Sequence, residues 1–244
     1  PLATFAMETY ADDPCALFGL RPVPGETISN PKTLRLLAQM HKAISIIQFK
    51  LEAETISRRP EFEMDDRMLL HLIDFERGII TINGKEYPMK DCNFPTIDPT
   101  DPYKLTDEEM EIVAKLHRSL VGSEKLRKHI KHIFRNGCMY TITNSNLLFH
   151  ASIPLNADGS LKEIEIRGKK YKGKALLEKV GHLIRTAYFA EGDSEEKRFA
   201  MDYVWYLWCG KDSPAFDKAK MATFERYFLD DKELHKETKG HYYT

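Results

Sequence analysis

The sequence lacks a long hydrophobic run. No apolar stretch approaches the roughly 20 residues that a membrane-spanning helix needs, although 42% of the 244 residues are hydrophobic. The opening segment has neither the basic start nor the apolar core of a signal peptide. We therefore expect no membrane partner. A chain that begins with Pro1 rather than Met also suggests a segment of a longer or processed protein.

Cysteine is scarce, and its spacing excludes the usual cysteine-based sites. Cys15, Cys92, Cys138 and Cys209 lie far apart, with no CxxC pair and no metal-knuckle spacing. In a chain of this length without an export signal, reduced thiols are expected rather than disulfides. This usage predicts a cytoplasmic protein.

An excess of either charge is also missing. Lys and Arg number 36 against 37 for Asp and Glu, so the formal net charge is -1. Nucleic-acid binding depends on clustered cations, so no nucleic-acid partner is expected. The sequence contains no HExxH, GxSxG, P-loop or GxGxxG motif. Taken alone, these patterns indicate a mixed helix-and-strand protein of unassigned activity.

A long helix is the clearest local prediction. After a Pro- and Gly-rich loop at residues 21–26, Asn30 can cap a helix that has Pro31 at its first position and ends by Arg59, before Pro60. Its apolar residues repeat at steps of three and four, which predicts one buried face. That face comprises Leu37, Met40, Ile44, Ile47 and Leu51, whereas Lys42, Lys50 and Glu52 are predicted to lie elsewhere on the helix surface.

Turn and cap signals organise the next stretch. Asn83-Gly84 predicts a hairpin near residues 78–90, because a type I′ turn requires two positive φ angles. The Pro- and Asp-rich residues 92–105 indicate an extended connector. Thr106 and Glu109 form a capping box, and Ser123 is expected to cap a further helix that stops at a left-handed Asn136-Gly137.

Short strands are predicted beyond residue 138. CMYTIT and LLFHASIP indicate two strands joined at residues 144–146, and the apolar residues of the second predict that it is buried. Residues 156–172 indicate another hairpin with a turn at Asp158-Gly159. Helices are expected over 174–188 and 194–209.

His150 is the most informative candidate site residue. It lies near the end of a predicted strand and is followed by the small residues Ala151 and Ser152. Reactive groups gather at strand ends, and a neutral imidazole there suits a divalent metal. The alternative is a core histidine satisfied by a backbone carbonyl.

Other candidates carry weaker signals. His129 and His132 share a helix face, but the surrounding cations would repel a metal, so this segment is interpreted as a basic solvated helix. Both tryptophans lie between Trp205 and Lys211, as expected of a packed aromatic helix. Lys211 and Arg226 follow aromatic residues and are candidates for contacting a phosphate.

Several longer strings resemble the bacterial class III fructose-1,6-bisphosphatases. They are HKAISIIQFKLE (41–52), ISRRPEFEMDDR (56–67), SEKLRKHI (123–130), DYVWYLWCGK (202–211) and MATFERYF (221–228), in this order. The resemblance covers nearly the whole chain. It implies membership of the calcineurin-like metallophosphoesterases, in which two divalent metals, usually manganese, lie between layers of a β-sandwich flanked by helices.

The resemblance also implies a division of the chain. Residues 1–20 would end a preceding catalytic-core region, 21–137 would form a mainly helical class-specific insertion, and 138–244 would form the second half of the core. The expected fold class is therefore α+β or α/β, with part of a β-sandwich. Such an insertion could cap the active site, bind a neighbouring subunit in a homo-oligomer or hold an effector, and the sequence leaves these roles open.

The implied site is incomplete here. LLFHASIP is similar to the superfamily block in which a strand ends in His, so His150 inherits the role of metal ligand, although Ala151 replaces the more usual Gly. The D-x-H, G-D-x-x-D-R and G-N-H-[DE] blocks are absent, because Gly192-Asp193 is followed by an unrelated sequence. Gly240-His241 also lies outside the context of the late G-H block.

The resemblance thus implies a segment of a gluconeogenic phosphatase. Its substrate would be the sugar bisphosphate fructose 1,6-bisphosphate, hydrolysed to fructose 6-phosphate and phosphate, and the isolated segment is expected to be inactive. The alternative is a noncatalytic helical interaction module, a scaffold whose long helix pairs with a partner through the stripe from Leu37 to Leu51.

Overall fold

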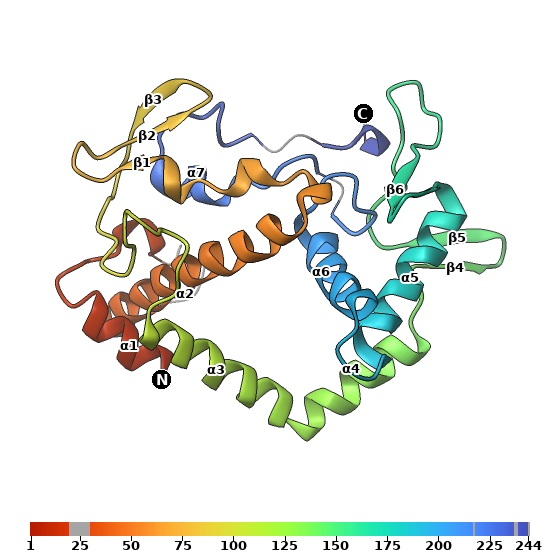
Figure 1. Ribbon diagram of the computed structural model, residues 1–244, viewed down its shortest axis with the longest axis horizontal. Helices are drawn as coiled ribbons and strands as arrows, with labels where there is room; N and C mark the ends of the chain where they lie inside the picture. Colours follow the sequence, from red (N-terminus) through yellow and green to blue (C-terminus); the bar gives the residue numbers. More distant parts are fainter. Residues whose placement is uncertain (20–29, 217, 237–238, 244) are drawn as a thin grey trace. The chain divides into compact units, whose positions relative to one another are not determined.

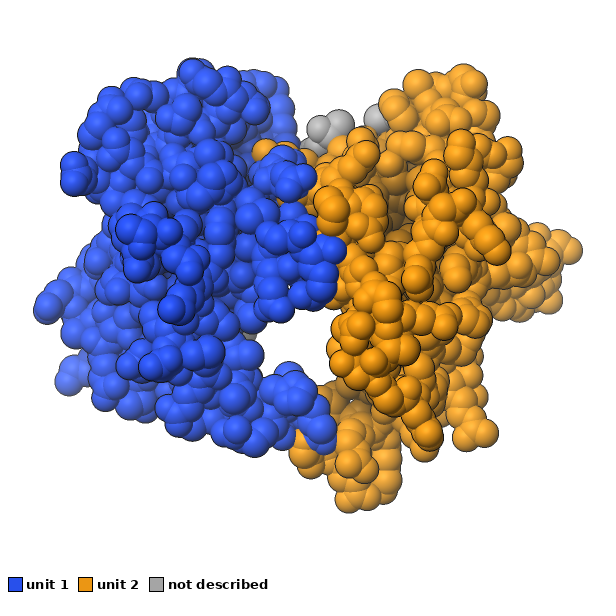
Figure 2. Space-filling model, viewed as in Figure 1, with its two compact units in different colours: residues 1–58, 65–121, 222–236 blue, residues 59–64, 122–221, 237–244 orange. Residues whose placement is uncertain are grey.

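The chain divides into two compact units. The computed structural model describes residues 1–19, 30–216, 218–236 and 239–243, so the loop predicted at residues 21–26 lies outside the described residues. Unit 1 comprises Pro1–Arg58, Asp65–Val121 and Ala222–Lys236, and unit 2 comprises Arg59–Met64, Gly122–Met221 and Glu237–Thr244 (Figure 2). Each unit is described below by itself.

Unit 1 is built around the long helix α2 (Pro31–Arg58), as the cap and stripe predict. The backbone N–H of Lys32 donates to the Asn30 side chain at 3.0 Å, which confirms the cap. The other helices and strands of this unit are α1 (Leu2–Thr9), β1 (Ile73–Asp74), β2 (Ile79–Ile82), β3 (Lys85–Pro88), α3 (Asp107–Gly122, whose last residue belongs to unit 2) and α7 (Thr223–Phe228), with 3-10 turns at Ala16–Phe18, Asp65–Arg67 and Leu70–Leu72 (Figure 1).

One core joins these elements. Ile46 and Ile47 of α2 are buried together with Ile80 of β2 and with Phe228 of α7. Phe94, from the connector, packs edge to face on Phe228 with ring centroids 5.1 Å apart. Residues separated by more than 180 positions in the sequence therefore share one hydrophobic cluster, which removes their apolar surface from water.

The structure corrects the prediction that three charged residues of α2 lie on the helix surface. Lys42, Lys50 and Glu52 are buried, not exposed. Burial of a charged group is tolerated where partners of opposite charge are available. Lys42 pairs with Asp13 and Asp91, each at 2.6 Å, and Lys50 pairs with Glu109 at 2.7 Å. The helix is therefore enclosed on more sides than its apolar stripe indicates.

The predicted turn and capping box of unit 1 are confirmed. Strands β1, β2 and β3 form an antiparallel sheet in that order. Asn83 and Gly84 occupy the β2–β3 turn with φ of 51° and 76°, as a type I′ turn requires. At the start of α3, the Thr106 N–H donates to the Glu109 carboxylate at 2.9 Å, and the Glu109 N–H donates to the Thr106 hydroxyl at 3.2 Å.

Unit 2 combines three helices and two hairpins. They are α4 (Glu124–Asn136), β4 (Tyr140–Thr143), β5 (Asn146–Phe149), β6 (Ile164–Ile166), β7 (Lys169–Tyr171), α5 (Gly173–Phe189) and α6 (Glu195–Cys209), with 3-10 turns at Pro60–Phe62 and His241–Tyr243 (Figure 1). Ser123 caps α4 as predicted, accepting from the Leu126 N–H at 3.3 Å. Gly137, however, is extended with φ of -75°, so the predicted left-handed stop is wrong.

The second strand of the first hairpin is exposed, contrary to the prediction that it is buried. Strands β4 and β5 pair around Asn144-Ser145 as an isolated two-stranded sheet. Leu147 and Leu148 on β5 are both exposed. A two-stranded sheet buries little by itself, and among the described residues no further strand joins this one.

The turn of the second hairpin does not lie at Asp158-Gly159, where the sequence predicts it. Strands β6 and β7 pair across Arg167-Gly168, with φ of 52° and 75°. Asp158-Gly159 forms a separate small turn, in which the Ser160 N–H donates to the Asp158 carboxylate at 2.9 Å. Asp158-Gly159 and Arg167-Gly168 both contain a turn-forming glycine. The paired strands form within the shorter segment 164–171.

The fold is therefore mixed. Helices dominate, and every strand pair among the described residues is antiparallel, which agrees with the α+β class. Those strands form three separate small sheets and do not themselves make a sandwich. The boundaries at residues 20 and 137, which the resemblance places between a catalytic core and a helical insertion, stay a prediction. None of the helices in the described part of the chain is both long and apolar enough to cross a bilayer.

Candidate functional site

His150 stands directly after β5, at the position that the sequence predicts. Its side chain is exposed among the described residues, so these residues do not bury it as a core histidine. It lines a hollow of about 350 Å³ whose other walls include Ile133 of α4, Ile184 of α5 and Trp208 of α6. The imidazole therefore has an open, largely apolar approach.

The metal expected from the resemblance requires more ligands than this hollow offers. A dinuclear site is built from several His and carboxylate side chains. Within the described residues, no three His, Cys, Asp or Glu side chains are grouped closely enough to hold a metal ion. Cys138 and His150 are the metal-ligating residue types that line the hollow. The described residues alone do not fit a complete metal centre.

The two phosphate candidates lie in different units. Lys211 follows α6 in unit 2 and is exposed, and its backbone carbonyl accepts a hydrogen bond from the Tyr206 hydroxyl. Arg226 lies on α7 in unit 1, where its guanidinium donates to the His235 carbonyl at 3.3 Å.

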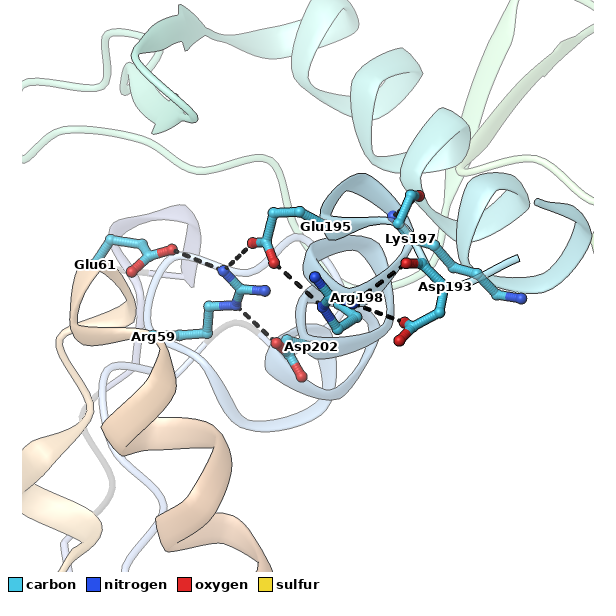
Figure 3. Close-up of polar contacts among 8 residues, drawn as sticks. Arg59, Glu61, Asp193, Glu195, Lys197, Arg198 and Asp202 are labelled. Atoms are coloured by element: carbon cyan, nitrogen blue, oxygen red, sulfur yellow. Dashed lines mark hydrogen bonds and ion pairs between the residues drawn. The ribbon is translucent and has the colours of Figure 1, made fainter. Parts of the chain in front are cut away.

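A cluster around Arg59 is a feature that the sequence did not single out. In Figure 3 the guanidinium of Arg59 lies between carboxylates of α6, donating through Nε to Asp202 and through Nη1 to Glu195, both at 2.7 Å. Its side chain is only 9% exposed. Arg198, on the same helix, extends the chain of charges from Glu195 to Asp193.

The electrostatics of this cluster are mutually reinforcing. Burial opposes the charge on Arg59, but the hydrogen bonds that it donates to Glu195 and Asp202 outweigh burial and raise the pKa of the guanidinium. The Arg59 hydrogen bond in turn lowers the pKa of Glu195. The guanidinium therefore stays charged and fixes residues 59–64 onto α6.

A larger hollow adjoins this cluster. It measures about 760 Å³ and lies between residues 59–63, the β6–β7 turn and the first turns of α6. The guanidiniums of Arg59 and Arg167 each lie 5.3 Å from the centroid of the Phe199 ring. Phe62 packs on Tyr203 and Tyr206 at the same place. Four glutamates also line it (Glu61, Glu63, Glu165 and Glu195), so the lining carries more negative than positive charge.

Unit 1 holds a second buried ionic cluster. The ammonium of Lys42 lies between Asp13 and Asp91 and over the rings of Tyr10 and Phe94, at 5.3 and 5.5 Å. Burial alone would raise the pKa of Asp13, but hydrogen bonds from Lys42 and from the Cys15 N–H lower it. The same burial, together with the Asp13 charge, raises the pKa of the Cys15 thiol to about 12. The charged groups of this cluster therefore pair with one another and are largely shielded from solvent.

Comparison with known proteins decides the family. The family model described as Firmicute fructose-1,6-bisphosphatase matches residues 1–244. The chain belongs to this family. The resemblance stated from the sequence strings is thereby confirmed.

Curated relatives are similar along the whole chain. A class 3 fructose-1,6-bisphosphatase of Phocaeicola vulgatus is 75% identical over 245 residues. The proteins of the same name from Bacteroides fragilis and Porphyromonas gingivalis are 65% and 54% identical over 244 residues. Each alignment covers 100% of this chain and 37% of the relative, so the chain spans about a third of these relatives' length. No solved structure matches the chain.

Sequence reasoning placed His150 after a strand, as the structure has it, but missed the buried ions. A histidine after an apolar strand is a local signal. Arg59 lies 143 residues from Asp202, and Lys42 lies 29 and 49 residues from its two carboxylates, so no local pattern links them. The one available signal was the position of Lys42 and Lys50 within an otherwise apolar-rich helix.

Proposed function

We propose that this chain forms part of a longer metal-dependent phosphatase that hydrolyses fructose 1,6-bisphosphate to fructose 6-phosphate and phosphate. The proposal is supported by the family match over residues 1–244 and by the printed name of relatives up to 75% identical. Those relatives are longer, because the alignment takes in 37% of their length. The reaction fits a gluconeogenic enzyme of the cytoplasm.

Within that phosphatase, His150 serves as one ligand of a dinuclear centre, with manganese as the metal. Its exposure at the end of β5 and its open hollow support this role. The remaining ligands come from polypeptide outside these 244 residues, since the described residues group no three candidate ligands. Divalent metals would supply charge neutralisation at the phosphate and a more acidic bound water.

The β4–β5 hairpin and the helices that follow it belong, in this proposal, to the second half of a β-sandwich core. Among the described residues no further strand joins the hairpin, and this, with its exposed apolar residues, supports a sheet that is completed by other strands. Lys211 and Arg226 remain candidates for contacting a substrate phosphate, and a homo-oligomer remains compatible with the helical insertion.

The decisive experiment is His150→Ala in the longer protein. We expect the loss of at least one manganese equivalent in a metal titration and a fall of at least a hundredfold in phosphate release, because ligand loss removes the metal's Lewis acidity. His132→Ala is the matched control, since His132 lies exposed on α4 and should change neither readout. Full metal content and activity in His150→Ala would refute the role.

The isolated 244-residue chain tests the other half of the proposal. It should show no turnover of fructose 1,6-bisphosphate, because the residues that the structure describes do not complete a metal site. Measurable hydrolysis by this segment would show that the site lies elsewhere in it. The scaffold alternative predicts instead a stable partner complex that persists when His150 is replaced.

A further inference from the structure

The hollow beside Arg59 is enclosed by three segments of unit 2. Its walls come from residues 59–63, from β6 with the turn that follows it, and from α6. The volume of about 760 Å³ lies within the range of pockets that bind small molecules. Every residue that lines it belongs to unit 2, so the hollow is a feature of this unit alone.

The negative charge on these walls exceeds the positive charge that neutralises it. Arg59 is already paired with Glu195 and with Asp202, both at 2.7 Å (Figure 3). Three further glutamates line the hollow, against one further cation, Arg167. Two of these glutamates have no ion-pair partner among the described residues (Glu63 and Glu165). The walls therefore attract cations.

Aromatic rings form much of the remaining wall. The ring of Phe199 already holds two guanidiniums of the protein itself, and Phe62 packs on Tyr206 with ring centroids 4.8 Å apart. Burial raises the pKa of the Tyr206 hydroxyl, and the Glu63 carboxylate adds to this effect, so Glu63 lies near that ring. Ring faces attract cations and also pack against alkyl chains. A ligand with positive charge and an apolar body fits such a wall.

Tyr203 brings to this hollow a hydroxyl that the protein does not use. The residue is only 4% exposed and lines the hollow. Its ring packs on Phe62 and Phe199, but its hydroxyl has no hydrogen-bond partner among the described residues. Burial raises the pKa of this phenol, so it stays protonated. A nearly buried hydroxyl without a partner costs free energy, and its oxygen can accept a hydrogen bond from an ammonium group.

We propose that this hollow binds a primary aliphatic diamine, a small organic dication. One ammonium group donates to the Tyr203 hydroxyl and pairs with the Glu63 carboxylate. The methylene chain packs on the rings of Phe62 and Tyr206, and the second ammonium group pairs with the other lining glutamates. Four glutamates against two arginines leave an excess of two negative charges on the lining, which the two ammonium groups match.

A divalent metal ion carries the same charge but fits less well. Such an ion needs several oxygen ligands at one point, and within the described residues no three His, Cys, Asp or Glu side chains are grouped closely enough to hold one. A linear dication instead reaches carboxylates that lie apart. The proposal uses neither His150 nor the expected manganese, so it does not rest on the proposed function.

Equilibrium dialysis of the longer protein against labelled putrescine measures this binding directly. We expect saturable binding with a dissociation constant below about 1 mM, and binding about tenfold weaker for n-butylamine, which has a single ammonium group. Magnesium chloride at the putrescine concentration should displace little of the ligand. The proposal is overturned by the absence of saturable binding or by full displacement with magnesium, which would indicate a diffuse acidic surface. Equally tight binding of n-butylamine or acetyl-lysine amide would also overturn it, because the hollow would then recognise a single ammonium group, as on a lysine side chain.

Matched variants of the longer protein assign the binding to these residues. Tyr203→Phe keeps the packed ring and removes the hydroxyl, so it should weaken putrescine binding about tenfold. Glu63→Gln should weaken it about threefold, because Glu63 is exposed. Glu196→Gln is the control, since Glu196 is exposed on α6 and does not line the hollow, and it should leave binding unchanged. Tryptophan fluorescence during urea unfolding shows that each variant is folded. Wild-type affinity in folded Tyr203→Phe, or an equal loss in Glu196→Gln, would overturn the proposal.

Discussion

The Arg59 Nε donates a 2.7 Å hydrogen bond to the Asp202 Oδ2 across 143 residues of sequence. Both side chains are nearly buried, and the same guanidinium also reaches Glu195. This bond fixes the short segment 59–64, where the chain enters unit 2, onto helix α6 (Figure 3). The Arg59 ion pairs thus hold that segment together with the packing of Phe62 on Tyr203 and Tyr206.

Replacing Arg59 with Lys should weaken unit 2 by about 2 kcal/mol, because one ammonium cannot reproduce the two hydrogen bonds that the guanidinium directs to separate carboxylates. The chain's two tryptophans, Trp205 and Trp208, both lie on α6. Their fluorescence during urea unfolding therefore reports this unit. Arg198→Lys is the control, since Arg198 is more exposed and its replacement should shift the curve much less. Equal shifts of the two unfolding curves would show that the Arg59 hydrogen bonds stabilise unit 2 no more than the contacts of Arg198 do.

In unit 1, the Lys50–Glu109 pair supports a second prediction. The two groups are 2.7 Å apart with almost no exposure, and Lys50 also donates to the Thr96 carbonyl at 2.6 Å. Glu109→Gln removes the negative charge and leaves a buried ammonium among neutral partners, so we expect a loss of about 3 kcal/mol. Hydrogen exchange of α2 should accelerate by about a hundredfold. The neighbouring exposed Glu108→Gln should leave exchange within a few fold, and similar effects of the two variants would contradict the prediction.

The pH dependence of unit 1 should follow Asp13. Its pKa in the folded protein lies below the ordinary value of 3.8, so the unfolded chain takes up the proton first as the pH falls. The stability contribution is therefore complete above about pH 4 and is lost as the pH falls through the lower folded pKa. We expect the stability difference between the wild type and Asp13→Asn to shrink from pH 6 to pH 3 in hydrogen-exchange measurements of α2. Because the pair with Lys42 is buried, 0.5 M salt should preserve the difference. A difference that is independent of pH would contradict this assignment.

Local signals account for what the sequence predicted correctly. The caps at Asn30, Thr106 and Ser123 and the turn at Asn83-Gly84 each depend on residues within three positions of one another. Their geometry is set by backbone hydrogen bonds and positive φ angles, which a short stretch of sequence specifies by itself. The place of His150 was predicted in the same way, from the strand that precedes it, and its role as a metal ligand stays a prediction.

The errors have a common physical origin. Lys42, Lys50 and Glu52 were expected on the surface because helical periodicity assigns a face to each residue without reference to distant carboxylates. Leu147 and Leu148 were expected to be buried because the strand is apolar, yet their cover is absent from the described residues. In both cases the environment of a side chain depends on partners remote in sequence.

Unit 1 is assembled from three stretches of chain, the last of which is Ala222–Lys236. Phe224 and Phe228 from that stretch occupy its core, whereas the intervening residues 122–221 form most of unit 2. During synthesis on the ribosome, the central helix α2 must therefore wait for about 160 further residues before its aromatic packing partners emerge. The stretch Gly122–Met221, which forms most of unit 2, is translated before Ala222–Lys236, so most of unit 2 is available before the core of unit 1 is complete.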